Sequence, residues 1–303
     1  MRSFAFLVNP SSGGGAAPKV VVPLTRVLRE AGAQVDVTYT TSIAETPALV
    51  AAAIARGAVV VSVGGDGMLS SVAGEVAAQG GVLAVVPAGR GNDFARMLEI
   101  PHDTAAQAEL LLHGEERAID LLRATSGDGT AHVVAGSVYA GVDARAAEIV
   151  DRSHWLPSAL QYPVAAVRAL ATYRPVRCVL EVDGARSSHE AATVVIANSR
   201  FYGKGMAIAP SASVSDGLLD VIVIEAAGRL DLIRALPKVY DGGHVDLDEV
   251  TVLTGHRVTL SGDYAGGGAV PVGADGEALD ALPADAGSPL AVDLMPGALR
   301  ILR

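Results

Sequence analysis

VVVSVGGDG, residues 59–67, decides the fold, because it joins a valine-rich run directly to a glycine-rich turn. The run Val59–Val63 is short, apolar and β-branched, which predicts a strand buried on both faces of a parallel sheet. Helical spacing of apolar residues follows from Met68 to Ala78. Glycines let a ligand approach the backbone, and a helix N-terminus offers free N–H groups and a positive dipole end. The stretch therefore predicts a phosphate-binding turn, the alternative being a tight turn with Asp66 as helix N-cap.

Strand and helix patterns alternate on both sides of this stretch through the first 120 residues. The predicted strands are 4–8, 35–40, 59–63, 82–86 and 117–122, and the predicted helices are 19–31, 44–56, 68–78 and 104–113. Such alternation is typical of a parallel sheet covered by helices on both faces. We therefore predict an α/β domain over residues 1–121.

The rhythm changes after Leu122, where strand-like runs recur with turn residues between them. These runs are 132–139, 176–182, 193–197, 219–224, 257–260 and 270–272, interrupted by one helical stretch, 158–173. The pattern predicts a mainly antiparallel, β-rich second domain over residues 122–303. Its last strand, 298–303, could pack on either domain.

Composition excludes several classes of protein. The chain has 303 residues, half of them hydrophobic, a formal charge of −10 and no run of Lys or Arg. A nucleic-acid partner is therefore disfavoured, and so is strong electrostatic attachment to anionic membranes. Contact with a membrane surface would therefore depend on apolar side chains. The most apolar stretch, 48–63, is interrupted by Arg56 and Gly57 and is shorter than the ~20 residues of a membrane span.

A single cysteine, Cys178, rules out an internal disulfide and fits a cytoplasmic location.

Two more glycine-rich segments follow predicted strands. NPSSGGG, residues 9–15, comes after the first strand, and PAGRGNDF, residues 87–94, comes after the fourth. Each alone is also compatible with a solvent loop. Because the carboxyl ends of parallel strands share one edge of a sheet, we expect the three glycine-rich loops to lie together there.

Other nucleotide and hydrolase motifs are absent from the sequence. It contains no G-x-x-x-x-G-K-[ST], no G-x-G-x-x-G and no G-x-S-x-G, which disfavours a P-loop, a Rossmann dinucleotide site and an α/β-hydrolase. The seven histidines show no spacing typical of metal ligands.

Two acidic segments stand out in the second half. They are Asp216–Asp220, which reads DGLLD, and Asp275–Glu277, which reads DGE. Each is also compatible with an ordinary Asp-Gly turn. Phosphoryl transfer needs a base near the acceptor hydroxyl and a cation near the phosphates, and carboxylates opposite a glycine-rich loop could supply both.

The ordered set of motifs resembles the diacylglycerol kinase catalytic-domain family, in particular its soluble bacterial lipid kinases, with sphingosine kinases as relatives. The matching segments are NPSSGGG (9–15), GGDG (64–67), PAGRGNDFAR (87–96), AID (118–120), NSRFYGKGMAIAP (198–210), DGLLDV (216–221) and DGE (275–277). The resemblance implies that residues 1–121 form the nucleotide-binding domain and residues 122–303 the lipid-substrate domain, with the nucleotide in the cleft between them. It also implies ATP and Mg²⁺ as cofactors and phosphorylation of a lipid hydroxyl. The acceptor it implies is diacylglycerol, which would become phosphatidic acid.

The resemblance also implies roles for individual residues. The nucleotide would contact Asn9, Gly13, Gly14, Thr41, Gly64, Gly65, Asp66, Gly67, Gly89, Arg90, Gly91 and Asn92. Catalysis would fall to Asp66 and the DGE motif, with Glu277 favoured over Asp275 as general base. The Asp216 side chain and the carbonyls of Ser213 and Leu218 would bind Mg²⁺, with Asp120 and Asp220 behind the ion.

The chain departs from the family pattern at several positions. The family usually reads GGDGT-x-NE, whereas this chain has Met68, Ser70 and Ser71, and Arg90 replaces a threonine of the family's GTGN. Met68 cannot donate a hydrogen bond to phosphate, whereas Arg90 could contact phosphate directly. These changes are also compatible with a non-catalytic relative of the family that binds nucleotide or lipid. An NAD kinase-like enzyme shares the GGDG loop, but the other motifs disfavour it.

The resemblance implies a lipid partner at the membrane surface, with transient membrane association. A nucleic-acid partner is not expected, and the sequence is compatible with a homodimer. The stretch Trp155–Tyr173 is apolar and either lines an acyl-chain channel or forms an amphipathic helix packed on the sheet.

Overall fold

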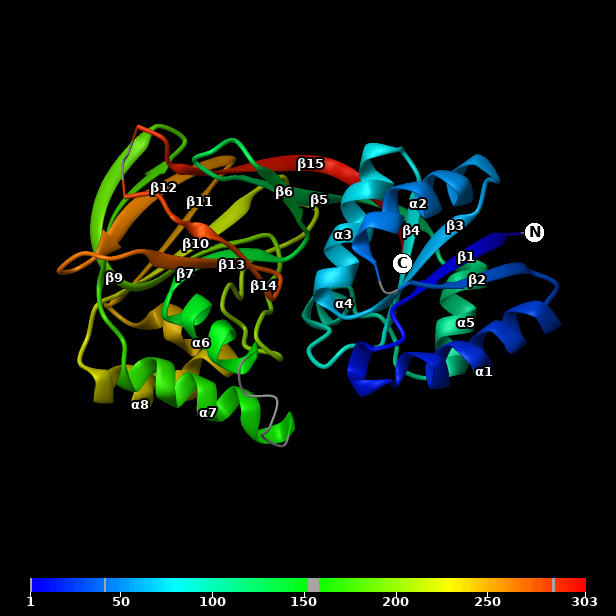
Figure 1. Cartoon of the computed structure of the whole chain (residues 1–303), viewed down its shortest axis with the longest axis horizontal. Coiled ribbons are helices and arrows are strands. Elements are labelled where there is room, and N and C mark those ends of the chain that lie inside the picture. The colour runs from blue at the N-terminus through cyan, green and yellow to red at the C-terminus, as the bar shows by residue number, and fades with distance from the viewer. Residues whose placement is uncertain (1, 41, 152–157, 285–286) are drawn as a thin grey trace. The chain divides into compact units, whose positions relative to one another are not determined.

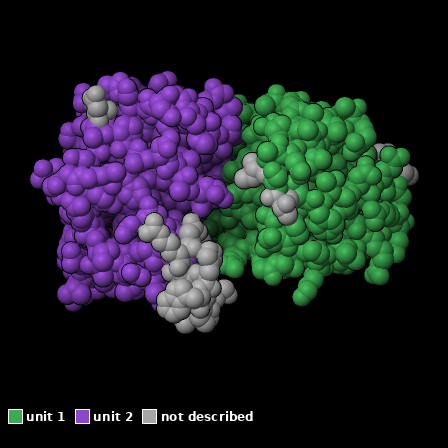
Figure 2. All heavy atoms as spheres, in the orientation of Figure 1, with its two compact units in different colours: residues 1–121, 296–303 green, residues 122–295 purple. Residues whose placement is uncertain are grey.

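The computed structural model describes residues 2–40, 42–151, 158–284 and 287–303. The chain divides into two compact units, residues 1–121 with 296–303, and residues 122–295 (Figure 2). Among the described residues, no helix combines the length and the apolar character needed to cross a membrane.

The first unit is built on a parallel sheet. Its strands are β1 (Ser3–Val8), β2 (Gln34–Tyr39), β3 (Val59–Gly64) and β4 (Val82–Pro87), in the order β4-β3-β1-β2, and the end of β15 (Leu290–Leu302) pairs in parallel with β4. β1, β3 and β4 are almost entirely buried, whereas in the edge strand β2 three residues are exposed and the other three are partly exposed. The central strands are almost wholly apolar because both of their faces are covered.

Helices follow the strands of this unit (Figure 1). They are α1 (Ala17–Glu30), α2 (Thr46–Ala55), α3 (Asp66–Ala78), α4 (Asp93–Met97) and α5 (Thr104–His113), with single 3₁₀ turns at Ser12–Gly14 and Ile43–Glu45. Pro18 and Pro47 lie in the first turns of α1 and α2, where a missing N–H costs nothing. The Asp103 side chain caps α5 by accepting from the Ala106 N–H at 2.8 Å.

The second unit is β-rich and its described strand pairs are antiparallel. Its strands are β6 (Ala131–Val134), β7 (Ser137–Gly141), β8 (Val176–Val182), β9 (Ala185–Ala197), β10 (Leu219–Glu225), β11 (Val250–Gly255), β12 (Arg257–Tyr264), β13 (Val270–Ala274) and β14 (Glu277–Leu282), with the chain entering through β5 (Glu116–Thr125). The helices α6 (Val142–Asp151), α7 (Ser158–Ala171) and α8 (Arg229–Asp241) and a 3₁₀ turn at Gly243–Asp246 complete it. The predicted fold class, a parallel α/β domain followed by an antiparallel β-rich domain, is confirmed.

Some predicted elements differ from the observed ones. The strand expected over 132–139 is two strands, β6 and β7, because the backbone of Ala135–Ser137 turns to bind a side chain described below. The sequence reading also missed α6, α8, β11 and β14. Helix α3 begins at Asp66, and its N-cap is Gly65 rather than Asp66.

Candidate functional site

The three glycine-rich loops of the first unit lie against one another. A Cβ atom added at Gly13 would collide with the backbone oxygen of Ala88, and one added at Gly89 would collide with the Cα of Gly65. Gly13 also has a φ of 61°, which favours glycine. Backbones this close leave no room for side chains, so the loops after β1, β3 and β4 form one glycine-lined surface, as the sequence predicted.

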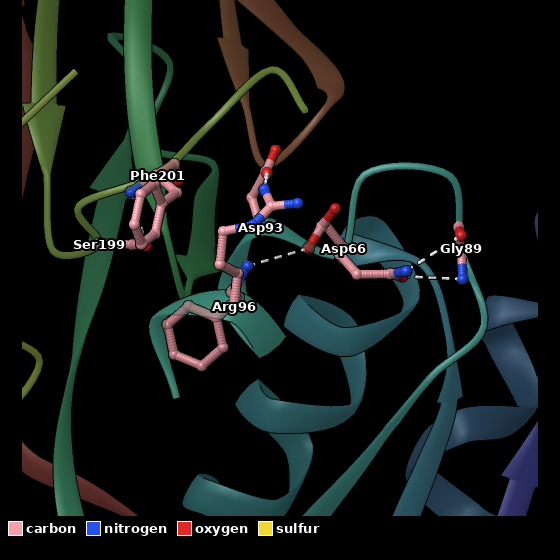
Figure 3. A network of polar contacts seen from close by, with 8 residues as sticks. Asp66, Gly89, Asp93, Arg96, Ser199 and Phe201 are labelled. Atoms are coloured by element: carbon pink, nitrogen blue, oxygen red, sulfur yellow. Dashed lines mark hydrogen bonds and ion pairs between the residues drawn. The ribbon is translucent and has the colours of Figure 1, made fainter. Parts of the chain in front are cut away.

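Asp66 connects two of these loops. It is the first residue of α3, and its Oδ1 accepts a hydrogen bond from the Phe94 N–H at 3.3 Å (Figure 3). A Cβ atom on Gly91 would lie 3.1 Å from Asp66 Oδ2, so the carboxylate lies directly beside the loop that follows β4. Asp66 thus lies where free N–H groups at the start of α3 favour negative charge.

The loop after β4 is closed by its own side chains. Asn92 adopts a left-handed backbone conformation with a φ of 54°, and its Oδ1 accepts from the Gly89 N–H at 2.8 Å. Its Nδ2 donates to the Gly89 oxygen at 3.1 Å. In the short helix that follows, Arg96 forms an ion pair with the buried Asp93 at 2.8 Å. These contacts give the loop one shape, with the side chain of Arg90 exposed at its tip.

The remaining residues predicted to bind nucleotide lie at the same strand ends. Asn9 follows β1, donates its N–H to the Val63 oxygen at 3.0 Å and accepts from the Ser11 N–H at 2.9 Å. Gly14 has open space around its Cα, and Gly67 lies in the first turn of α3. The Met68 thioether packs on Gly64, where an added Cβ would be 2.8 Å from the sulfur. Thr41 lies outside the described residues.

In the second unit, the Asp275 carboxylate binds three consecutive backbone N–H groups. It accepts from Ala135 at 2.8 Å, from Gly136 at 3.0 Å and from Ser137 at 2.9 Å. The backbone of Asp275 has a φ of 46°, an unfavourable region that this network holds in place. Asp275 therefore anchors the turn that precedes β14, and its oxygens are occupied by amide donors.

The surroundings of Glu277 differ from those of Asp275. It is the first residue of β14, its side chain is exposed, and it has no hydrogen-bond or ion-pair partner within the part of the chain that the structure describes. Of the two carboxylates of the DGE motif, Glu277 is the one whose oxygens are available to a substrate.

Tyr139 supports the same turn from β7. Its hydroxyl oxygen accepts from the Gly276 N–H at 3.2 Å. Its ring covers Gly273, where a Cβ would lie 2.5 Å from the ring, and packs against Tyr202 with the ring centres 5.8 Å apart. The turn is thus held at Asp275 by three amides and at Gly276 by a phenol.

Sequence reasoning missed Asp143, at the start of α6. Its carboxylate accepts from the Thr193 hydroxyl at 2.7 Å and from the Tyr202 side chain. Burial raises the pKa of Asp143, and these two hydrogen bonds oppose that shift. The signal available in the sequence was an aspartate directly after the strand-like run that ends at Gly141, but the partners Thr193 and Tyr202 are more than 45 residues away.

We predict that Tyr139→Phe lowers kcat roughly tenfold, the cost of about one hydrogen bond that holds Glu277 in position. The ring over Gly273 is kept, so the free energy of unfolding should fall by no more than about 0.5–1.5 kcal/mol, the contribution of one hydrogen bond. Steady-state kinetics should show an unchanged KM for nucleotide, and Tyr240→Phe, at an exposed tyrosine of α8, serves as the control. An equal loss of kcat in both variants would show that Tyr139 does not hold Glu277 in position.

The segment predicted to bind Mg²⁺ precedes β10. Asp216 is exposed and its Oδ1 accepts from the Leu218 N–H at 3.1 Å, while Ser213 Oγ accepts from the Ser215 N–H at 3.4 Å. Asp220 is buried and accepts from the Ser211 hydroxyl at 2.7 Å. Burial raises the pKa of Asp220, and the negative charge of Asp216 raises it further.

These residues fit a hard cation. The described side chains contain no cluster of three or more His, Cys, Asp or Glu suited to a metal. However, Mg²⁺ keeps several waters and is often bound by one or two carboxylates, so Asp216 with neighbouring carbonyls is a suitable oxygen set. A cation there would also offset the repulsion between Asp216 and Asp220. Asp120 lies in the first unit, where it accepts from the Gly297 N–H at 2.7 Å and anchors the returning strand β15.

The fold and these loops define a phosphotransferase with a glycine-lined α/β domain and a β-rich partner domain. Comparison with known proteins gives the same class. The model of the diacylglycerol kinase catalytic domain matches residues 3–124, and that of the YegS C-terminal NAD kinase β-sandwich-like domain matches residues 136–303.

Individual relatives extend over nearly the whole chain. A diacylglycerol kinase of Mycobacterium tuberculosis is 32% identical over 98% of this chain and 94% of its own length. A diacylglycerol kinase of Bacillus subtilis is 24% identical over 88% of this chain and 91% of its own. The crystal structure of a diacylglycerol kinase from Bacillus anthracis strain Sterne shares the fold, with a TM-score of 0.75 over 99% of this chain and 96% of that one, at 18% identity. The chain therefore belongs to the diacylglycerol kinase family and is a lipid kinase.

Proposed function

We propose that this lipid kinase transfers the γ-phosphoryl group of ATP to the free hydroxyl of diacylglycerol at a membrane surface and forms phosphatidic acid. The observation that carries the proposal is the convergence of three glycine-rich loops beside Asp66 at the start of α3. Relatives at 32% and 24% identity that are named diacylglycerol kinases support the choice of acceptor.

The loops of the first unit would hold the nucleotide. Their glycines let the phosphates approach backbone N–H groups, and the start of α3 adds a positive dipole end. Arg90, whose side chain is exposed, would add a cation for the phosphates at the position of the threonine in the family's GTGN pattern. Met68 packs on Gly64 and contributes shape rather than a hydrogen bond.

Asp216, with the carbonyls of Ser213 and Leu218, would hold Mg²⁺, and Asp220 would support Asp216 from the interior. When bound, the ion would neutralise negative charge that develops on the phosphates.

Glu277 would act as general base. The acceptor oxygen attacks the γ-phosphorus, the bond from that phosphorus to the bridging oxygen breaks, and ADP leaves with the bond's electrons. The acceptor proton passes to the Glu277 carboxylate. Asp275 and Tyr139 would keep Glu277 in place.

A cavity of about 380 Å³ in the second unit would take part of the lipid. It is lined by Val142, Arg145, Glu148, Ala169, Thr172, Tyr173, Arg174, Tyr264, Ala269, Pro271 and Ala281. Its walls include the end of the stretch Trp155–Tyr173, whose Trp155 lies outside the described residues. Its volume is at the low end for small-molecule sites, roughly 300–1,000 Å³, so it suits one portion of a lipid rather than a whole diacylglycerol.

The test measures transfer from γ-labelled ATP to several acceptors in mixed micelles: diacylglycerol, a sphingoid base, and NAD as the acceptor of the related kinase class. We expect labelled phosphatidic acid as the main product and no transfer without Mg²⁺. Transfer only to NAD or to the sphingoid base would replace the proposed acceptor. Nucleotide binding without transfer to any acceptor would contradict the proposal and favour a binding protein.

A further inference from the structure

A serine, a histidine and a glutamate form a hydrogen-bonded chain in the second unit, apart from the residues assigned to phosphoryl transfer. His189 Nε2 lies 2.8 Å from the Ser187 hydroxyl, and His189 Nδ1 lies 2.6 Å from Glu225 Oε1. Ser187 and His189 belong to β9, and Glu225 is the last residue of β10. The three groups have the separations of a nucleophile, its general base and the carboxylate that orients the base.

The hairpin of β8 and β9 places the serine and the histidine on one face. Its two-residue turn, Asp183 and Gly184, has φ values of 48° and 87°, which is typical of the tight turns that fix strand register. Residues two apart on a strand point to the same face, so Ser187 and His189 lie together. Glu225 comes beside them because β10, which ends at this residue, pairs with the second half of β9.

The carboxylate decides which nitrogen of the histidine ring carries the proton. An ionised carboxylate only accepts hydrogen bonds, so His189 Nδ1 is the donor to Glu225. In the neutral ring, Nε2 is then the acceptor, and the Ser187 hydroxyl donates to it. This is the tautomer that can take the proton of the serine when the serine oxygen attacks an electrophile.

One edge of β9 is open beside the serine. β8 pairs with the first half of β9 and β10 with the second half, and Ala191, where the two halves meet, pairs with both. β8 and β10 therefore lie on opposite edges of β9, and beside Ser187 the edge away from β8 has no partner among the described strands.

This open edge presents a backbone donor next to the serine. The Glu190 carbonyl accepts from the Ala226 N–H at 2.7 Å, so the backbone groups of Glu190 point away from β8. Backbone groups of residues two apart on a strand point to the same edge, so the Ser188 N–H also points to the open edge. An electrophile that reached the partly exposed Ser187 would find in this N–H a donor for the negative oxygen that develops during attack.

Cys178 lies opposite His189 on β8 and does not compete as the nucleophile. Burial and, next, the negative charge of Glu225 raise the pKa of the Cys178 thiol to about 11, so the thiol keeps its proton at neutral pH. A protonated, buried thiol is unreactive. The reactive group of the cluster is therefore the serine hydroxyl.

We propose that Ser187, His189 and Glu225 hydrolyse small carboxylic esters, an activity separate from phosphoryl transfer. The cavity of the second unit is not lined by these residues, so the acyl group would lie along the open edge of β9. An open edge encloses little of a substrate, which favours short acyl groups such as acetyl.

The reaction has two halves that share one proton carrier. The Ser187 oxygen attacks the ester carbonyl carbon, its proton passes to His189 Nε2, and the bond to the alcohol oxygen breaks as the alcohol takes that proton. Water then attacks the acyl-serine and gives a proton to the same nitrogen. The bond to the serine oxygen breaks, the carboxylic acid leaves, and the proton returns to Ser187. Glu225 stays ionised throughout and holds the ring in place.

The test measures hydrolysis of p-nitrophenyl acetate by the full chain, together with labelling by a fluorophosphonate, which reacts with activated serines. We expect release of p-nitrophenol and a phosphonate adduct on Ser187, located by mass spectrometry of peptides. Ser187→Ala should abolish both. His189→Gln and Glu225→Gln should each slow both by about 10²–10⁴-fold, the usual effect of removing a general base or the group that orients it.

Ser188→Ala and His256→Gln are the matched controls. Ser188 is the exposed neighbouring serine on the opposite face of β9, and its backbone N–H is kept in the variant. His256 is an exposed histidine whose Nδ1 lies 3.1 Å from the Asp183 carboxylate. Both variants should hydrolyse the ester and take the label like the unchanged protein.

Two outcomes would overturn the proposal: an unchanged protein that carries no adduct on Ser187, and controls that lose as much activity as the cluster variants. Both measurements are made without ATP and without lipid. A wrong kinase acceptor would therefore leave this result standing, and an unreactive Ser187 would leave phosphoryl transfer intact.

Discussion

Glu277→Gln is expected to lower kcat by about 10²–10⁴-fold, the usual contribution of a positioned general base. Glutamine keeps the shape of the side chain and cannot accept the acceptor proton. Glu277 is exposed and has no partner among the described residues, so the exchange should leave the turn and the free energy of unfolding unchanged. The KM for ATP should stay within about twofold, because an effect confined to the transition state lowers kcat alone.

Steady-state kinetics with ATP and micellar diacylglycerol would test this, alongside direct measurement of nucleotide binding. Asp280→Asn is the matched control, since Asp280 is exposed on the same strand and its exchange removes the same charge. A Glu277→Gln variant that loses nucleotide binding as much as turnover would show that Glu277 does not act as the base.

Asp275→Asn should impair both stability and activity. The Asp275 carboxylate accepts three backbone N–H groups, from Ala135, Gly136 and Ser137. An amide brings an NH₂ group toward these donors and removes the charge that strengthens the hydrogen bonds. Hydrogen bonds to charged groups contribute about 1.5–3 kcal/mol each, so we expect a loss of about 2–4 kcal/mol in the free energy of unfolding.

Urea unfolding of Asp275→Asn, Glu277→Gln and the unchanged protein separates the two roles. Asp275→Asn should unfold at a lower urea concentration and turn over slowly, because the turn that presents Glu277 is loosened. Glu277→Gln should unfold like the unchanged protein. If Asp275→Asn kept full stability and lost only turnover, Asp275 would be the base and Glu277 would lose that assignment.

The amino-acid sequence by itself determined most of the first unit. The strand 59–63, the glycine turn and the helix after it follow from local periodicity, and β3 and α3 form there. The convergence of the glycine loops could also be predicted, because carboxyl ends of parallel strands meet at one edge whatever the details of packing. The DGE motif could be recognised from the sequence because it contains two carboxylates.

The tertiary structure alone decided how the DGE motif is held. Asp275 binds amides near Gly136, about 140 residues earlier in the chain, and Gly276 binds Tyr139. The same contacts divide the predicted strand 132–139 in two. The hydrogen-bond network around Asp143 likewise could not be predicted from the sequence. Periodicity records which side of an element is buried, because that pattern repeats every few residues. A single hydrogen bond between distant segments leaves no such repeat, so it appears only when the chain is folded.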